Sequence, residues 1–233
     1  MNARRLCRRV FNVFYRRHVL PRIAVPSEAW LLGRRFVTHP EVFHPVFFLS
    51  TRMLADHFAR IDLAGRRFLD MGTGSGAVGI FAAARGARVT ACDVNPRAVA
   101  VARENARQNG VEMEVLESHL YSAVAGRTFD LICFNIPFYP KPPESPLEHA
   151  FHAGRDFQTV RAFAGDTPPH LAEGGVVTII FSEDSGYDRI VSFFTAAGLE
   201  RTGTRSLRKN FEEFFIVSFR RPEGLPLVRA SET

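Results

Sequence analysis

A glycine-rich turn between a strand pattern and a helix pattern is the feature that most limits how this chain can fold. Residues 68–80 read FLDMGTGSGAVGI, in which a short apolar run passes into three glycines at alternate positions and then into a helical pattern. Glycine allows the backbone to turn tightly and to approach a ligand closely, and the amide groups of the following helix N-terminus favour polar or anionic groups. The segment predicts a ligand site at the carboxyl end of a parallel strand.

Strand and helix patterns alternate along the chain from about residue 49. Helical patterns cover 49–61, 77–86, 96–110, 156–172 and 188–198, and strand patterns cover 66–71, 87–94, 111–118, 128–135 and 174–181. The last two strand patterns, LERTGTRSL and FEEFFIVSFR, are joined by only three residues, 208–210. The fold class predicted is therefore α/β: a doubly wound, mostly parallel, seven-stranded sheet with a C-terminal antiparallel hairpin.

The positive charge of the chain is concentrated at its N-terminus. The net charge is +6, yet residues 1–35 hold nine Arg against one Glu, and the other 198 residues carry 21 basic and 23 acidic side chains. Residues 4–19 place Leu6, Val10, Val13 and Phe14 at helical spacing among arginines, which predicts a short basic amphipathic helix. Its apolar face would dock on the body of the protein, and binding to an anionic surface stays open as the alternative.

Several protein classes are disfavoured by the composition. No stretch approaches the roughly 18 consecutive apolar residues of a membrane span, and the N-terminus lacks a secretory apolar core and cleavage site. The three cysteines, Cys7, Cys92 and Cys133, are scattered and odd in number, so neither a disulfide framework nor a metal cluster is expected. We expect a cytoplasmic protein without a metal, and the sequence makes no prediction about its oligomeric state.

Two further signals lie where neighbouring strand patterns end. Asp93 follows the glycines by about 20 residues, where a carboxylate can bind a ribose diol. The strand pattern 128–134 runs into Asn135-Ile136-Pro137-Phe138, which places an amide, backbone carbonyls and an aromatic ring at the same sheet edge. The Asn135 oxygen and the Ile136 carbonyl can accept N–H groups, and Phe138 can stack on a flat group, which suits a planar nitrogen nucleophile. Because the glycines also satisfy the dinucleotide fingerprint, a nicotinamide-dependent oxidoreductase stays open here.

Taken together, four stretches resemble the class I S-adenosylmethionine-dependent methyltransferases: FLDMGTGSGAVGI, ACDVNPRAVAVARENARQNG, FDLICFNIPFY and HLAEGGVVTII. Within that class the chain is similar to the HemK-like N-methyltransferases, whose signature is Asn-Pro-Pro-Tyr/Phe. Residues 42–54 and 147–161 are similar to the segments that such enzymes place over the cofactor and after the signature. The resemblance implies that S-adenosyl-L-methionine binds at Asp70, Gly72, Thr73, Gly74, Gly76, Asp93, Val94, Asn95, His119 and Asn135, and that Asn135, Ile136, Pro137 and Phe138 are catalytic.

Two residues depart from the family pattern. Ile136 replaces the first proline of the signature, and it could act through its backbone carbonyl or through a side chain that packs on the acceptor. His119 stands where many members have an aspartate against the adenine amino group, so adenine recognition would rest on backbone groups or on neutral His119. These departures also leave open a cofactor-binding module without activity.

The resemblance leaves the methyl acceptor open among a protein glutamine, an exocyclic base nitrogen, a lysine, and a small amine or amide. We predict a planar nitrogen of a small-molecule or protein acceptor and do not favour nucleic acid. Relatives that methylate release factors carry a longer N-terminal helical domain than residues 1–35 could supply, which favours a small molecule over a protein glutamine. The expected domains are a basic helix and linker at 1–35, the methyltransferase domain at 36–221 and a C-terminal tail at 222–233.

Overall fold

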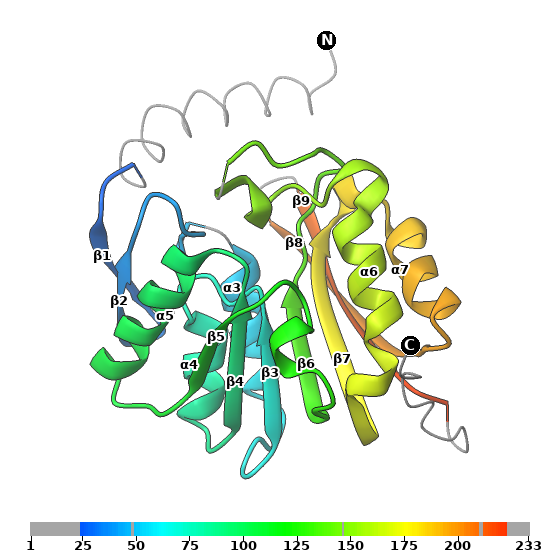
Figure 1. Ribbon diagram of the computed structural model, residues 1–233, viewed down its shortest axis with the longest axis horizontal. Helices are drawn as coiled ribbons and strands as arrows, with labels where there is room; N and C mark the ends of the chain where they lie inside the picture. Colours follow the sequence, from blue (N-terminus) through cyan, green and yellow to red (C-terminus); the bar gives the residue numbers. More distant parts are fainter. Residues whose placement is uncertain (1–23, 48, 146, 210–211, 223–233) are drawn as a thin grey trace.

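The computed structural model describes residues 24–47, 49–145, 147–209 and 212–222. These residues form one central sheet with helices on both faces, and a small separate hairpin stands beside one end of the sheet (Figure 1). The basic helix predicted at 4–19 and nearly all of the predicted C-terminal tail lie outside the described residues. None of the described helices is long and apolar enough to cross a membrane.

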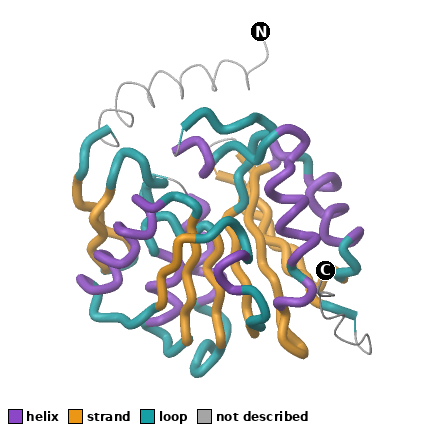
Figure 2. The backbone as a smooth tube through the Cα atoms, in the orientation of Figure 1, coloured by secondary structure: helices purple, strands orange, loops and turns teal. Residues whose placement is uncertain are grey.

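The sheet has seven strands in the order β5-β4-β3-β6-β7-β9-β8, which confirms the predicted fold class (Figures 1 and 2). Its first five strands are parallel, and β9 runs antiparallel between β7 and the edge strand β8. The strands are β3 (Arg67–Met71), β4 (Arg88–Asp93), β5 (Glu114–Glu117), β6 (Phe129–Asn135), β7 (Leu171–Ser182), β8 (Glu200–Lys209) and β9 (Glu212–Arg220). Because these strands are parallel, the loops after β3, β4 and β6 lie at one sheet edge. The chain reverses its direction across the sheet after β5 and returns to β6 beside β3, and open α/β folds bind ligands at such a reversal.

In the described part of the chain, five α-helices cover the sheet: α3 (Leu49–Phe58), α4 (Ala77–Ala83), α5 (Pro96–Gln108), α6 (Gln158–Asp166) and α7 (Tyr187–Ala196). The side chains of α3 and α4 pack with alternate residues of β3, β6, β7 and β9 in one apolar cluster. Those of α6 and α7 pack in a second cluster with the intervening residues of the same strands. Strands buried on both faces explain why the sequence shows continuous apolar runs there rather than alternation.

The β1–β2 hairpin corrects the expected domain boundary. Strands β1 (Ser27–Leu31) and β2 (Arg34–Thr38) pair antiparallel, so the expected boundary between residues 35 and 36 falls inside β2. Leu32 and Gly33 form the turn, and both have positive φ, as a type I′ turn requires. A leucine rarely occupies that position, so the turn lacks the usual Asn-Gly signal and the sequence did not predict the hairpin.

Asn105 of α5 ties the hairpin to the glycine-rich loop. Its side chain is fully buried, accepts a hydrogen bond from the Val37 amide (2.6 Å), and donates to the carbonyl oxygens of Val37 (3.0 Å) and Ser75 (2.9 Å). One amide therefore satisfies three backbone groups from two segments that are far apart in the sequence. The hairpin is part of the same packed unit as the sheet.

We expect Asn105→Ala to lower the free energy of unfolding by about 2–4 kcal/mol, because it leaves buried backbone groups of Val37 and Ser75 without partners. The matched control is Asn109→Ala at the end of α5, which removes hydrogen bonds to the Arg35 and Asn105 carbonyl oxygens at a half-buried position. Water can replace those contacts, so the control should cost less than about 1 kcal/mol. Denaturant unfolding measures both, and equal losses would contradict the role given to Asn105.

Candidate functional site

A cavity of about 290 Å³ lies at the carboxyl ends of β3, β4 and β6. Its walls come from the loops after these strands, from residues 41–43 that follow the hairpin, and from the segment between β6 and α6. Ten predicted site residues line it: Asp70, Gly72, Thr73, Gly74, Asp93, Val94, Asn95, His119, Asn135 and Pro137. Gly76, Ile136 and Phe138 do not line it.

The glycines of the loop after β3 are required by close packing. A Cβ atom on Gly72, whose φ is +63°, would stand 2.7 Å from Cε2 of Phe134. Gly76 has a φ of +83° and begins α4, and a Cβ there would stand 3.1 Å from the Cα atom of Ala102 in α5. Gly76 is predicted to bind the cofactor, but its place is against α5 rather than in the cavity, so it shapes the loop for its neighbours.

Asp70 is a buried carboxylate at the end of β3. Its Oδ2 atom accepts hydrogen bonds from the Thr73 hydroxyl (2.7 Å) and from the Gly79 amide of α4 (2.9 Å). The pKa of Asp70 is raised to about 6. Burial is the main cause, the charge of Asp93 acts in the same direction, and the two hydrogen bonds oppose both. The carboxylate is therefore poorly stabilised when it is ionised in the free protein.

Asp93 is a second carboxylate of the site, half-buried, and it connects two loops. Its two oxygens accept hydrogen bonds from the Gly74 amide (2.8 Å) and the Asn95 amide (2.9 Å). Burial raises the pKa of Asp93, while these hydrogen bonds and the nearby His149 act in the opposite direction. Asn95 caps α5 through the Arg97 amide and donates to the carbonyl oxygen of Glu41, so the wall at 41–43 is held to β4.

Asn135 presents an unused hydrogen-bond acceptor. Its Nδ2 atom donates to the hydroxyl of Ser50 at 3.1 Å, and Ser50 is buried in the first turn of α3. Its Oδ1 atom is buried and has no hydrogen-bond partner among the described residues. Buried acceptors are nearly always satisfied in folded proteins, so an unsatisfied one in a cavity indicates a ligand group that donates a hydrogen bond.

The three residues after Asn135 have different surroundings. The Ile136 side chain is 1% exposed and belongs to the core beneath α6 and α7, and its amide donates to the Ile180 carbonyl oxygen at 3.3 Å. The hypothesis that this side chain packs on the acceptor is therefore wrong, and only the backbone of Ile136 can serve the site. Pro137 lines the cavity, whereas the half-buried ring of Phe138 lies beside Phe214 at 6.2 Å.

The segment between β6 and α6, with the start of α6, supplies a wall whose individual residues the sequence did not predict. His149 of the segment and Gln158 and Thr159 of α6 line the cavity. The ring of Phe151 lies 5.4 Å from that of Phe43, which also lines the cavity. The only sequence signal for them was the similarity of residues 42–54 and 147–161 to family segments. Ser50 falls in the first of these stretches, but nothing in the sequence linked it to Asn135.

His119 and Val94 are, together with Gly72, the exposed members of the predicted cofactor set. Both line the cavity, from the loops after β5 and β4 respectively. The turn that carries His119 is fixed by Ser118, whose hydroxyl donates to the Leu120 carbonyl oxygen and accepts from the Ala123 amide. His119 thus stands at the cavity rim in a defined loop.

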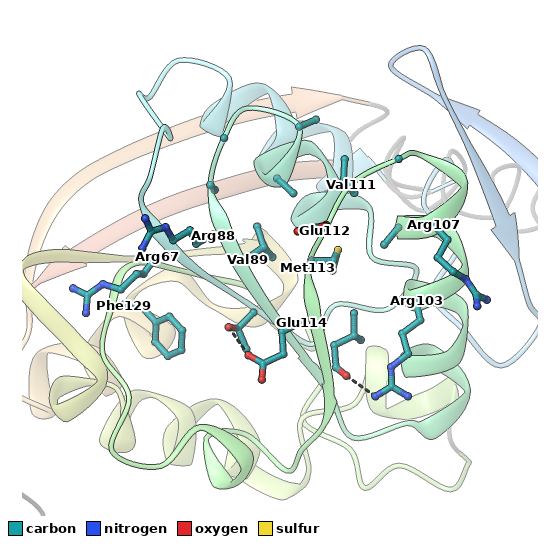
Figure 3. Close-up of a pocket in the computed structure, with 18 of the residues that line it drawn as sticks. Arg67, Arg88, Val89, Arg103, Arg107, Val111, Glu112, Met113, Glu114 and Phe129 are labelled. Atoms are coloured by element: carbon teal, nitrogen blue, oxygen red, sulfur yellow. Dashed lines mark hydrogen bonds between the residues drawn. The ribbon is translucent and has the colours of Figure 1, made fainter.

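A wider hollow of about 1190 Å³ lies at the amino ends of β3 to β6, away from this site. Figure 3 shows Arg67 and Arg88 on one side, Arg103 and Arg107 on the other, and Glu112 and Glu114 between them. Most of its arginines are engaged: Arg67 with Asp130, Arg127 with Glu114, Arg107 with Glu104 and Arg103 with the Val115 carbonyl oxygen. The charges of this hollow are largely paired, so we do not regard it as the site.

The cavity and the fold agree with what is known of similar proteins. A family model described as methyltransferase small domain matches residues 33–204. A candidate protein N5-glutamine methyltransferase of Methanocaldococcus jannaschii is 31% identical over 192 residues, covering 80% of this chain and 95% of that protein. A release factor glutamine methyltransferase of Chlorobaculum tepidum is 32% identical over 178 residues, covering 66% of this chain and 60% of that protein.

The solved structures give the same fold. The 16S rRNA N2 G1207 methyltransferase of Thermus thermophilus, in complex with AdoMet and guanosine, superposes with a TM-score of 0.64 at 21% identity, over 84% of this chain and 50% of that one. The sheet and the cavity thus define the class I methyltransferases, which bind S-adenosyl-L-methionine. The chain belongs to the methyltransferase small domain family and is an S-adenosylmethionine-dependent methyltransferase, which decides against the nicotinamide-dependent oxidoreductase.

We expect Asp70→Asn to stabilise the ligand-free protein at pH 8 by about 1–3 kcal/mol, because each unit of pKa shift is about 1.4 kcal/mol and the amide oxygen can keep both hydrogen bonds. Between the ordinary pKa of 3.8 and the folded value of about 6, the folded protein binds more protons, so its stability falls as pH rises. The advantage of the variant should therefore shrink as pH falls from 6 to 4. Thermal unfolding at several pH values measures this, and a variant less stable than wild type at pH 8 would contradict it.

Proposed function

We propose that the enzyme methylates the side-chain amide nitrogen of a glutamine in a protein acceptor. The observation that carries the proposal is the unpaired, buried Oδ1 atom of Asn135. A primary carboxamide donates N–H groups from a planar nitrogen, which is the partner that this acceptor lacks. The names of the relatives from M. jannaschii and C. tepidum, both glutamine methyltransferases, support a protein acceptor over the small molecule.

The chemistry of the cavity fits S-adenosyl-L-methionine. The ligand carries an ammonium group, a cationic sulfonium and two ribose hydroxyls, and the cavity offers the carboxylates of Asp70 and Asp93, both made unstable by burial. Cations and hydroxyl donors would stabilise these carboxylates. We propose that Asp70, Gly72, Thr73 and Gly74 hold the amino acid part, and that Asp93, Val94, Asn95 and His119 hold the nucleoside.

The residues around Asn135 would position and activate the acceptor. When bound, S-adenosyl-L-methionine supplies an electrophilic methyl group on its sulfonium sulfur. The Asn135 oxygen and the Ile136 carbonyl would each accept one N–H of the acceptor amide, which orients its nitrogen and favours charge on it as the lone pair is used. With Nδ2 donating to the Ser50 hydroxyl, Asn135 would present Oδ1 to the acceptor.

We expect Asn135→Ala to lower turnover about a hundredfold or more while leaving cofactor affinity nearly unchanged, because it removes an acceptor aimed at developing charge. Label from radioactive S-adenosylmethionine is followed into the protein, RNA and small-molecule fractions of a lysate, with Asn109→Ala as a surface control. Label in the protein fraction on glutamine supports the proposal, whereas label only in RNA or in small molecules would overturn it.

We expect Asp93→Ala to weaken S-adenosylmethionine binding by about 1.5–3 kcal/mol, the scale of charge-assisted hydrogen bonds to a ribose diol. Titration calorimetry gives the dissociation constant, and circular dichroism checks that the Gly74 loop survives the loss of its partner. Asp130→Ala, which removes a carboxylate paired with Arg67 outside the cavity, is the control. An unchanged dissociation constant for the Asp93 variant would remove Asp93 from the cofactor site.

A further inference from the structure

An arginine on the edge strand β8 lies in the same row of the sheet as Asn135. Asn135 pairs with Ile180 of β7, Ile180 pairs with Ile216 of β9, and Ile216 pairs with Arg205 of β8. Residues in register point to the same face of a sheet, so Arg205 and Asn135 share the face that α3 covers. Three strand spacings of about 4.8 Å place the two backbones roughly 14 Å apart.

The Arg205 side chain has no counter-charge among the described residues. Its guanidinium makes no hydrogen bond or ion pair with them, and the same holds for the guanidinium of Arg60 just beyond the end of α3. Both arginines act on His57 of α3, whose pKa is lowered first by burial and then by these two positive charges. The positive charges of Arg205 and Arg60 therefore lie close enough to His57 to disfavour its protonated form.

Two acidic side chains on the same elements are engaged elsewhere. Asp56 of α3 lies 3.9 Å from Arg52, and Glu213 of β9 lies 3.1 Å from Arg208. The negative end of the α3 dipole accounts for a cation at Arg60, but it does not account for one on β8. Charges on an edge strand also deter aggregation, yet that role does not require Arg205 to stand beside Arg60 and His57.

Apolar side chains lie between Arg205 and the Asn135 motif. Leu207, two residues further along β8 on the same face, is 40% exposed and pairs with Phe214 of β9. The ring of Phe214 lies 6.2 Å from that of Phe138, which follows the Asn135 motif. All described side chains of β8 up to Arg208 are exposed, so this edge of the sheet is accessible from outside (Figure 1).

We propose that the β8–α3 surface, formed by Arg205, Leu207, His57 and Arg60, binds an acidic side chain of the protein acceptor. An extended chain advances about 3.3 Å per residue, so a span of roughly 14 Å places the acidic side chain about four residues from the glutamine that is methylated. The occupant follows from charge complementarity, since a second copy of this basic surface would repel the first. The inference depends on the proposed function for the glutamine, but the charge preference can be measured without methyl transfer.

The test measures binding of two labelled 15-residue peptides to the full chain by fluorescence anisotropy. Both peptides carry one central glutamine, and one has glutamates three to five residues away on each side where the other has serines. We expect the acidic peptide to bind at least fivefold more tightly, with a preference that declines with salt. Arg205→Gln should remove most of that preference and leave binding of the serine peptide unchanged.

The matched control is Arg201→Gln on the same strand. Arg201 pairs in register with Phe219, whose side chain belongs to the cluster beneath α6 and α7, so Arg201 lies on the opposite face, where it donates to the Tyr187 hydroxyl at 2.7 Å. This variant makes the same change in net charge and should keep the preference. Thermal unfolding of both variants verifies that neither has lost its fold.

Three results would overturn the inference: equal binding of the two peptides, equal losses in the two variants, or tighter binding of a 15-nucleotide RNA with the same dependence on Arg205. The proposed function fails separately. If neither peptide is methylated while the acidic preference and its dependence on Arg205 persist, the surface assignment holds and the glutamine assignment does not.

Discussion

The hydrogen bond from the Gly74 amide to the Asp93 carboxylate is the interaction on which the rest of the site depends. It joins the glycine-rich loop after β3 to the end of β4, and the second oxygen of Asp93 extends the connection to the start of α5. Asn105 then ties α5 to the same loop and to the hairpin. The loops after β3 and β4 are thus held by hydrogen bonds between their backbone groups and the side chains of Asp93 and Asn105, so their shape is set by contacts within the protein.

The carboxylates of Asp70 and Asp93 favour ligand binding but lower the stability of the ligand-free protein. Asp70 and Asp93 have raised pKa values because burial disfavours their charged forms. A protein selected only for stability would replace Asp70, since its two hydrogen-bond contacts need only an oxygen acceptor. The presence of both carboxylates is reasonable in a cavity whose ligand supplies cations and hydroxyl groups, and it illustrates the trade between stability and function at binding sites.

The two ends of the cavity differ in how far apart their residues lie in the sequence. The proposed cofactor end is built from backbone groups and carboxylates of β3 and β4, close together in the sequence. The proposed acceptor end combines Asn135 of β6 with Ser50 of α3, which are distant in the sequence and meet only because α3 packs on that face of the sheet. On this proposal, acceptor choice can change through α3, β8 and β9 while the cofactor end is kept.

The sequence by itself determined the sheet, the order of strands and helices, and the position of the cavity. These follow from local patterns, because apolar runs, helix stops and the glycines of residues 72–76 act over a few neighbouring residues. It did not predict the β1–β2 hairpin, since its turn contains Leu32 where Asn or Gly is usual, nor the burial of Ile136 under α6 and α7. The contact of Ser50 with Asn135 spans 85 positions in the sequence, and the row from Asn135 to Arg205 crosses four strands. Only tertiary structure decides such contacts, because strand register and helix packing are set by burial over the whole sheet rather than by the residues on either side.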